Sequence, residues 1–416
     1  MKNKLILILA TTLILFSGIS AAKKEGPSKV SIKVLKNNNY QLLVNNKPYV
    51  IKGFCYNPIP ISQGYDYDFW NDTRAPWKID GKLMKDMGVN TVRFYQSGED
   101  IESVKKVISE LYKSYGIRTI MGNWLGFWNY PAPFYADETF RKGVKEEVLK
   151  MVNDYKNEPG ILFWVLGNEN NYSFSGKVNS WSCAEIDSLE DANTRMNEKA
   201  RIYYSFIDEL TKEIHAIDPN HPVAMGNGEL ATLDVAKKHA PNIDIIACII
   251  YRGKSFGNIF KSLRNIFDKP LVFIEFGCDA YNAYTNKEDQ VSQAEFLESQ
   301  WHQIFQNVAN KGEGNCLGGA TFEWSDEWWK HKECYVEAWS NHDTESNWSN
   351  GAYYFDIKAE GNKNMNEEGF GVVSLSKSAK EGELDIRTPR KSYYVLKDLW
   401  RNPNKKINEK PKIKKK

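Results

Sequence analysis

Short apolar runs alternate along this chain with longer segments in which apolar and polar residues recur at helical spacing. Eight runs have the length and the β-branched and aromatic content of buried strands, and they cover residues 50–56, 89–95, 117–124, 161–169, 221–227, 243–251, 270–277 and 316–324. The segments between them favour helices over residues 81–87, 101–115, 139–155, 193–217, 230–238 and 290–309. A final segment, residues 388–400, has Pro389 near its start, as helices often do, and is expected to form the last helix.

The regular order of strand followed by helix predicts a parallel sheet covered by helices. Eight such units fit an α/β fold of the (β/α)8 TIM-barrel type, with one barrel domain over residues 28–402. An open doubly wound sheet is the structural alternative. That fold usually carries a glycine-rich phosphate loop after its first strand, and the sequence contains no such loop.

Three segments lie outside the repeating pattern. Residues 30–52 alternate with period two around turn-rich residues 37–39 and 45–48, which predicts a short N-terminal β-hairpin layer that caps the barrel floor. Residues 327–380 are rich in Trp, Asn, Asp and Gly and lack helical periodicity, so we expect an extended loop above the last strand. The lysine-rich tail, residues 403–416, is expected to be solvated and disordered, with binding to an anionic polymer as the alternative.

The first residues have the pattern of a secretory signal. Lys2 and Lys4 precede the apolar run 5–16, and small residues follow it. We therefore expect a signal peptide over residues 1–22 and a secreted or periplasmic protein. An uncleaved membrane anchor is the alternative, because the run approaches the roughly 20 residues of a spanning helix. No other stretch of the sequence is apolar enough to span a bilayer.

Charge and cysteine content narrow the classes of partner. The formal net charge is +2, so neither nucleic-acid binding nor general attraction to anionic surfaces is indicated. The six cysteines are too far apart for a zinc site and too few for a scaffold built on disulfides, although individual disulfides are compatible with them. His331 and His342 show no metal-ligand spacing. We expect no metal and no cofactor, and the sequence does not indicate the oligomeric state.

Two carboxylates end apolar runs. The fourth run ends in Asn168-Glu169, and in the seventh run Glu275 precedes the strand-ending Gly277. A salt-bridging or capping role would explain either glutamate alone, but burying both without a task would be costly. Strands four and seven face one another across the mouth of a barrel, where reactive groups of this fold gather. A pair of carboxylates is what cleavage of a glycosidic bond requires, at about 5 Å for retention of configuration.

The segments GNENN and FIEFG resemble the catalytic motifs of clan A glycoside hydrolases, which are retaining enzymes with a (β/α)8 barrel. The resemblance covers nearly all of the chain after residue 22. It implies that Glu169 is the acid/base and Glu275 the nucleophile. It also implies that Asn168 contacts the sugar 2-hydroxyl and that Arg93 and Tyr251 orient Glu275.

Two families of the clan share segments with this chain. VIKGFCY, VRFYQS, VFIEFGC and GGATFEWS are similar to segments of fungal cell-wall β-1,3-glucanosyltransferases. NNKPYVIKG and the eighth strand resemble the catalytic domain of the β-galactosidase and β-glucuronidase family, although this sequence lacks that family's leading β-sandwich domains. The fungal family's eighth-strand Tyr corresponds here to Phe322 or Trp324. Tyr56, Tyr95 and Trp324 complete the candidate substrate-binding residues.

The sequence therefore predicts a retaining glycosidase that acts on a β-linked oligo- or polysaccharide through a covalent intermediate. A β-glucanosyltransferase that remodels cell-wall or exported glucan is the first alternative, because hydrolysis and transfer share this chemistry. A non-catalytic carbohydrate-binding barrel is the second, and loss of either glutamate or of Asn168 would indicate it. Aromatic side chains near strand ends could stack on sugars or simply pack in the core; they are Trp124, Trp128, Trp324, Trp328, Trp329, Trp339 and Trp348.

Overall fold

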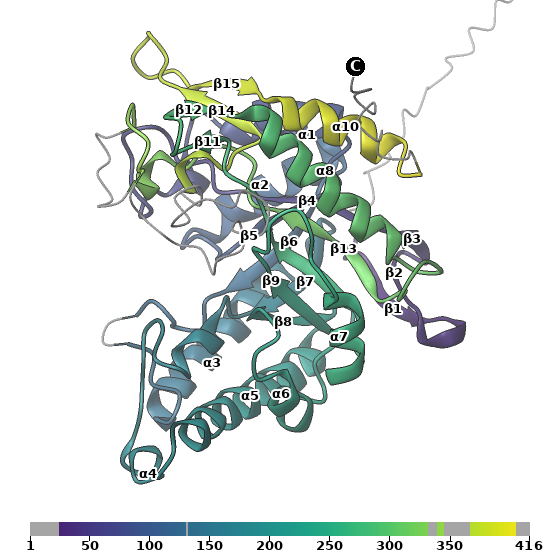
Figure 1. Ribbon diagram of the computed structural model, residues 1–416, viewed down its shortest axis with the longest axis vertical. Helices are drawn as coiled ribbons and strands as arrows, with labels where there is room; N and C mark the ends of the chain where they lie inside the picture. Colours follow the sequence, from purple (N-terminus) through teal and green to yellow (C-terminus); the bar gives the residue numbers. More distant parts are fainter. Residues whose placement is uncertain (1–24, 130–131, 332–338, 345–366, 405–416) are drawn as a thin grey trace, which may run out of the picture.

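A computed structural model describes residues 25–129, 132–331, 339–344 and 367–404 (Figure 1). Its centre is a closed barrel of parallel strands, which are β4 (Ile51–Cys55), β5 (Thr91–Phe94), β6 (Arg118–Asn123), β7 (Ile161–Leu166), β8 (Val223–Gly228), β9 (Ile245–Ile249), β10 (Leu271–Glu275) and β13 (Cys316–Thr321). The barrel closes where β13 pairs with β4. All eight predicted runs are strands, and the (β/α)8 fold is confirmed.

Helices pack around the barrel. They are α1 (Pro76–Met87), α2 (Ile101–Tyr115), α3 (Glu138–Tyr155), α4 (Ala184–Asp187), α5 (Ala192–Ile217), α6 (Leu233–His239), α7 (Ile259–Ile266), α8 (Gln290–Gln306) and α10 (Lys391–Arg401). Aspartates at positions 100, 137, 191 and 289 start four of them, because each carboxylate accepts hydrogen bonds from free backbone N–H groups of the first turn. The predicted helical segments did not include α7.

A small antiparallel sheet closes the barrel floor (Figure 1). It consists of β1 (Val30–Val34), β2 (Tyr40–Val44) and β3 (Lys47–Tyr49), with a 3-10 turn η1 (Lys36–Asn38) between the first two strands. Backbone hydrogen bonds tie it to the loops that precede barrel strands, as from the N–H of Val30 to the carbonyl of Asn220 at 2.8 Å. Leu42 and Val44 pack against apolar side chains of the barrel interior. The predicted hairpin layer is therefore present in the predicted place.

The chain after β13 contains more regular structure than the sequence indicated. The predicted loop over residues 327–380 includes the 3-10 turns η4 (Trp328–Lys330) and η5 (Glu367–Gly369) and the strand β14 (Val373–Ser376). β14 pairs with β15 (Ile386–Pro389). The last helix begins at Lys391 rather than at residue 388, because Pro389 ends β15. The remaining short elements are η2 (Phe69–Asn71), η3 (Asn170–Ser173), β11 (Tyr281–Asn282) and β12 (Lys287–Glu288).

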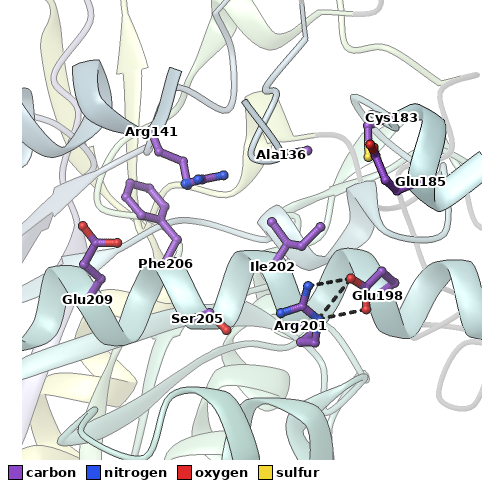
Figure 2. Close-up of a pocket in the computed structure, with 10 residues that line it drawn as sticks. All are labelled: Ala136, Arg141, Cys183, Glu185, Glu198, Arg201, Ile202, Ser205, Phe206 and Glu209. Carbon is purple, nitrogen blue, oxygen red and sulfur yellow. Dashed lines mark hydrogen bonds and ion pairs between the residues drawn. The ribbon is translucent and has the colours of Figure 1, made fainter. Parts of the chain in front are cut away.

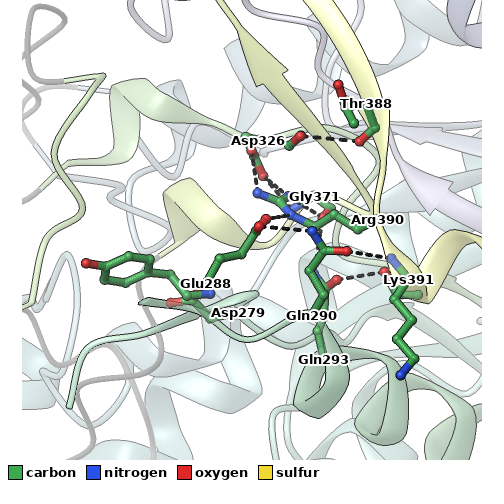
Figure 3. A network of polar contacts seen from close by, with 12 residues as sticks. Asp279, Glu288, Gln290, Gln293, Asp326, Gly371, Thr388, Arg390 and Lys391 are labelled. Carbon is green, nitrogen blue, oxygen red and sulfur yellow. Dashed lines mark hydrogen bonds and ion pairs between the residues drawn. The ribbon is translucent and has the colours of Figure 1, made fainter. Parts of the chain in front are cut away.

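A buried ion pair holds this C-terminal part to the barrel (Figure 3). Arg390 donates to both carboxylate oxygens of Asp326, at 2.5 and 2.9 Å, and to the carbonyl of Gly371 at 2.6 Å. Its Nε donates to Glu288 at 2.7 Å. Because Asp326 lies in the loop after β13 and Arg390 directly precedes α10, the pair fixes the start of that loop against the last helix, which lies beside α8 (Figure 1).

Several expectations concern residues outside the described part of the chain. The predicted signal peptide lies there, as do residues 405–416 of the predicted tail and Trp348. The five described cysteines are all free, and Cys334 is not among the described residues. Within the described ranges no helix is long and apolar enough to cross a membrane. No group of three or more candidate metal ligands occurs in that same part of the chain.

Candidate active site

Glu275 is the last residue of β10 and lies at the barrel mouth, only 7% exposed. Three donors reach its carboxylate. Arg93 Nη1 lies 3.2 Å and the Tyr95 hydroxyl 2.8 Å from Oε2, and the Tyr251 hydroxyl lies 2.7 Å from Oε1. These contacts occupy both oxygens and fix the side-chain orientation. The structure thus brings together four of the residues that the sequence singled out.

Arg93 joins the ends of two strands. It lies on β5 and is 1% exposed. Besides Glu275, its Nη1 donates to the carbonyl of Ile274 at 2.9 Å, and its Nη2 donates to Asn168 Oδ1 at 2.5 Å. The guanidinium also lies 4.1 Å above the Tyr95 ring. Arg93 therefore places the Asn168-Glu169 turn and Glu275 in a fixed relation.

Glu169 sits in a turn after β7 rather than in the strand itself. Both Gly167 and Glu169 have left-handed backbone conformations, with φ of 78° and 59°. A Cβ at Gly167 would lie 2.4 Å from the Tyr203 hydroxyl oxygen, so only glycine fits there. Asn170 holds the turn, because its side chain accepts from the N–H of Asn168 at 2.6 Å and donates to the Tyr135 hydroxyl at 2.7 Å.

The two glutamates have different environments. Burial raises the pKa of Glu169 to about 8, and the negative charges of Glu275 and Glu367 contribute in the same direction. The raised pKa favours the protonated form of Glu169. Glu275 instead has an Arg and two hydroxyl groups as donors to its carboxylate. A proton donor beside an oriented carboxylate is the arrangement that general acid catalysis with a nucleophile requires.

Trp324 does not reach the site, which corrects one expectation. Its side chain is fully buried and contacts the rings of Phe54 and Tyr393, with centroids 5.4 and 6.3 Å away. β13 ends at Thr321, so the alternation of faces stops before residue 324 and the indole lies against α10. Phe322 is the aromatic residue at the mouth, with its ring 6.4 Å from that of Tyr251.

The prediction that Tyr56 binds substrate is also wrong. It follows β4, is 1% exposed, and its hydroxyl donates to Asp80 on α1 at 2.9 Å. Arg387 pairs with the same carboxylate at 3.2 Å. Because the side chain points between the strands and α1, Tyr56 stabilises packing outside the barrel rather than contacting the mouth.

The sequence did not predict a charged group beside the site, formed by Glu327 and Lys330. Glu327 is 3% exposed and accepts a hydrogen bond from Asn57 at 3.1 Å, and burial raises its pKa to about 7. Lys330 forms ion pairs with Glu327 and Glu367. The acids of the run SDEWWK, directly after the eighth strand, were the available signal, because loops at that end of a barrel carry its functional residues.

Aromatic side chains extend from the site toward solvent. The Trp124 ring stacks on Tyr95 at 5.1 Å with an interplanar angle of 12°, and Trp128 meets Trp124 edge to face at 6.2 Å. Trp128 is 60% exposed. The three rings form a row that begins at Tyr95, which hydrogen-bonds to Glu275, and ends at the protein surface.

A separate hollow lies over α5, away from these groups (Figure 2). Within it Arg201 donates three hydrogen bonds to Glu198, so these charges are already paired. None of the site residues above lines it. The lining consists of Ala136, Arg141, Cys183, Glu185, Glu198, Arg201, Ile202, Ser205, Phe206 and Glu209.

Comparison with known families agrees with this geometry. The family described as "Glycosyl hydrolases family 2, TIM barrel domain" matches residues 34–336, and the chain belongs to that family. The resemblance to clan A glycoside hydrolases is thereby confirmed. Of the two families named from sequence segments, the match supports the one that includes β-galactosidases and β-glucuronidases.

Individual relatives are more distant. Mannan endo-1,4-beta-mannosidase 1 of Solanum lycopersicum is 26% identical over 213 residues, which are 46% of this chain and 50% of that protein. A GH2 beta-galacturonidase from Eisenbergiella tayi aligns with a TM-score of 0.54 at 17% identity, over 90% of this chain and 54% of that one. A beta-D-glucuronidase of Dictyoglomus thermophilum aligns with a TM-score of 0.53 at 18% identity, with the same coverage of both chains. At these identities the structures show the shared fold, and this chain spans about half the length of each protein.

Proposed function

We propose that this protein is a secreted, retaining β-glycoside hydrolase in which Glu275 is the nucleophile and Glu169 the acid/base. One observation carries the proposal. Glu275 is fixed by Arg93, Tyr95 and Tyr251, while burial and the negative charge of Glu275 raise the pKa of Glu169, in the turn after β7. Double displacement at an acetal carbon needs one glutamate that can donate a proton and a second that is oriented to attack.

In the first step, a carboxylate oxygen of Glu275 attacks the anomeric carbon and forms a glycosyl ester. The bond between that carbon and the leaving oxygen breaks, and the oxygen takes the proton of Glu169. The Tyr251 hydroxyl, which donates to Oε1 of Glu275, keeps the carboxylate oriented during attack. Asn168, held by Arg93, is the candidate contact to the sugar 2-hydroxyl.

The second step uses the same groups in reverse. Ester formation removes the negative charge of Glu275, which lowers the pKa of Glu169 because that charge was one of the influences raising it. Glu169, now a carboxylate, takes a proton from a water molecule. The water oxygen attacks the anomeric carbon, and the ester bond to Glu275 breaks, so the configuration of the substrate is kept.

We propose a β-linked oligo- or polysaccharide as substrate, with a mannan as the first candidate. The endo-acting mannosidase relative supports this choice, as does the aromatic row from Tyr95 to Trp128, which has the dimensions to bind more than one sugar. Transfer to a saccharide acceptor rather than water would follow the same two steps. The apolar N-terminal segment supports export.

The test is hydrolysis of β-1,3-, β-1,4- and β-1,6-linked oligosaccharides, with products resolved by length and their anomeric configuration read early by NMR. We expect shorter products of retained configuration, and longer ones if transfer competes. Glu275→Gln should abolish turnover because an amide cannot act as nucleophile. Glu313→Gln, at the barrel floor before β13, is the matched control and should behave as the native protein. Near-normal turnover of Glu275→Gln, or inverted products, would exclude the mechanism.

A further inference from the structure

The loop after β13 places a cation between two carboxylates beside the candidate nucleophile. Lys330 pairs with Glu367 and lies 3.6 Å from Glu327, which Asn57 holds from the opposite side. Lys330 Nζ also lies 5.5 Å from the centroid of the Phe322 ring. The three charged residues, Glu327, Lys330 and Glu367, are called the β13-loop triad below.

The triad borders the sugar-binding position. Phe322, under Lys330, faces the ring of Tyr251, whose hydroxyl bonds Glu275. The charge of Glu367 also raises the pKa of both Glu169 and Tyr251, after the effect of burial and of Glu275. A sugar bound for attack by Glu275 therefore lies within the field of the triad.

A buried polar atom beside the triad has no partner. Glu323 is 2% exposed, and its Oε1 makes no hydrogen bond within the described part of the chain. Burial raises its pKa well above the ordinary value, and Glu327 is the charge that adds most to this rise. Since buried polar atoms are nearly always paired, an unpaired carboxyl oxygen close to the charges of the triad points to a surface that meets polar ligand groups.

Three cations near the mouth, among the described residues, are already engaged by protein carboxylates, while Lys177, whose charge lowers the pKa of Glu169, lies 4.5 Å from the centroid of the Tyr172 ring. Arg93 binds Glu275 and Asn168, and Lys330 lies between Glu327 and Glu367. Arg252 pairs with Glu229. A substrate carboxylate would have to displace a carboxylate of the protein to reach either Arg93 or Lys330. It would also approach Glu275 and the two acids of the triad, and like charges brought together without water are strongly disfavoured.

We propose that the β13-loop triad sets the sugar specificity of the site, so that it accepts neutral hexosides and rejects hexuronides. Glu327 and Glu367 present acceptors to sugar hydroxyl groups, and Lys330 keeps both acids in place. The inference rests on the proposed function, because it assumes that Glu169 and Glu275 cleave a glycoside at this position.

The test uses aryl β-glycosides in pairs that differ only at carbon 6, as hydroxymethyl or carboxylate, in the gluco, manno and galacto configurations. We expect kcat/KM for at least one neutral member to exceed that of its uronide by about 100-fold or more, since like-charge contact costs several kcal/mol. Equal or faster cleavage of the uronide would overturn the specificity inference and leave the proposed function intact. Cleavage of none of the six would overturn the specificity inference, and the oligosaccharide test above then decides the proposed function separately.

Variants locate the effect. The double change Glu327→Gln and Glu367→Gln preserves shape and leaves Lys330 without carboxylate counter-ions, so the ratio of uronide to neutral kcat/KM should rise about tenfold or more. Glu381→Gln, an exposed carboxylate in the turn between β14 and β15, is the control and should leave the ratio unchanged. Circular dichroism checks that both proteins fold. A folded double variant with the native ratio would show that the triad does not select the sugar.

Discussion

At the scale of single residues, the proposed mechanism requires Glu169 to serve as acid and then as base. Removing it should affect substrates unequally, because an activated aryl leaving group departs without a proton. We expect Glu169→Ala to lower kcat on oligosaccharides by about 10²- to 10⁴-fold. The rate at which aryl glycosides form the glycosyl-enzyme should fall much less. Azide should then accelerate turnover and give a glycosyl azide of retained configuration. Equal losses on both substrate types without azide rescue would contradict the acid/base role.

The raised pKa of Glu169 also fixes the sign of the pH dependence. The protonated form is the acid, so kcat/KM for oligosaccharides should fall as the pH rises through about 8. This fall in kcat/KM should be absent for aryl glycosides with activated leaving groups, which depart without a proton. Parallel pH profiles of the two substrate types in the native protein provide the measurement.

Trp128 is the exposed end of the aromatic row that begins at Tyr95. If the row binds sugars beyond the one attacked by Glu275, Trp128→Ala should lower kcat/KM for long oligosaccharides about three- to tenfold and leave short aryl glycosides unchanged. Tyr394→Ala is a suitable control, because Tyr394 is 57% exposed on α10, far from the row in sequence and structure. An equal effect on long and short substrates would argue against a remote sugar contact.

At the scale of elements, the ion pair of Arg390 with Asp326 anchors the beginning of the loop after β13 to the chain before α10. Arg390→Met would leave Asp326 buried without its cation, and we expect about 3–5 kcal/mol lower free energy of unfolding. Arg201→Met removes the half-exposed pair with Glu198 on α5 and should cost about 1 kcal/mol or less. Urea unfolding compares the two. A second change, Asp326→Leu, should restore part of the loss in the Arg390→Met protein, because it removes the unpaired charge.

At the scale of the whole molecule, the acids at the barrel mouth link stability to pH. Burial raises the pKa values of Glu169 and Glu327 from an ordinary 4.5 to about 8 and about 7, and that of Glu368 to about 8. The folded state binds protons more tightly than the unfolded chain, so their stabilising effect is complete below pH 4.5 and is lost as the pH rises through 7 and 8. The melting temperature should therefore be lower at pH 8 than at pH 5.

The double change Glu169→Gln and Glu327→Gln isolates this effect. Its melting temperature should decline less between the two pH values than that of the native protein, while Glu381→Gln should follow the native protein. The same decline in all three proteins would mean that other groups control the pH dependence.

Patterns in the chain predicted the fold and the candidate catalytic pair. Parallel strands of a barrel are buried on both faces, so each appears in the sequence as an apolar run between more polar helical segments. The eight strands could be predicted for this reason. Glu169 and Glu275 were readable because each is a charged residue at the end of such a run. Family membership rests on the same segments, which lie within the matched residues 34–336.

Tertiary structure alone decided which neighbours reach the site. Trp324 and Tyr56 lie beyond the ends of their strands, whereas Glu275 is the last residue of β10, and the side chains of both aromatic residues lie outside the barrel. The β13-loop triad could not be placed from sequence, since Glu367 is separated from Lys330 by 37 residues along the chain. Sequence period reports the direction of a side chain only within a regular element, and beyond the strand ends packing against other elements determines it.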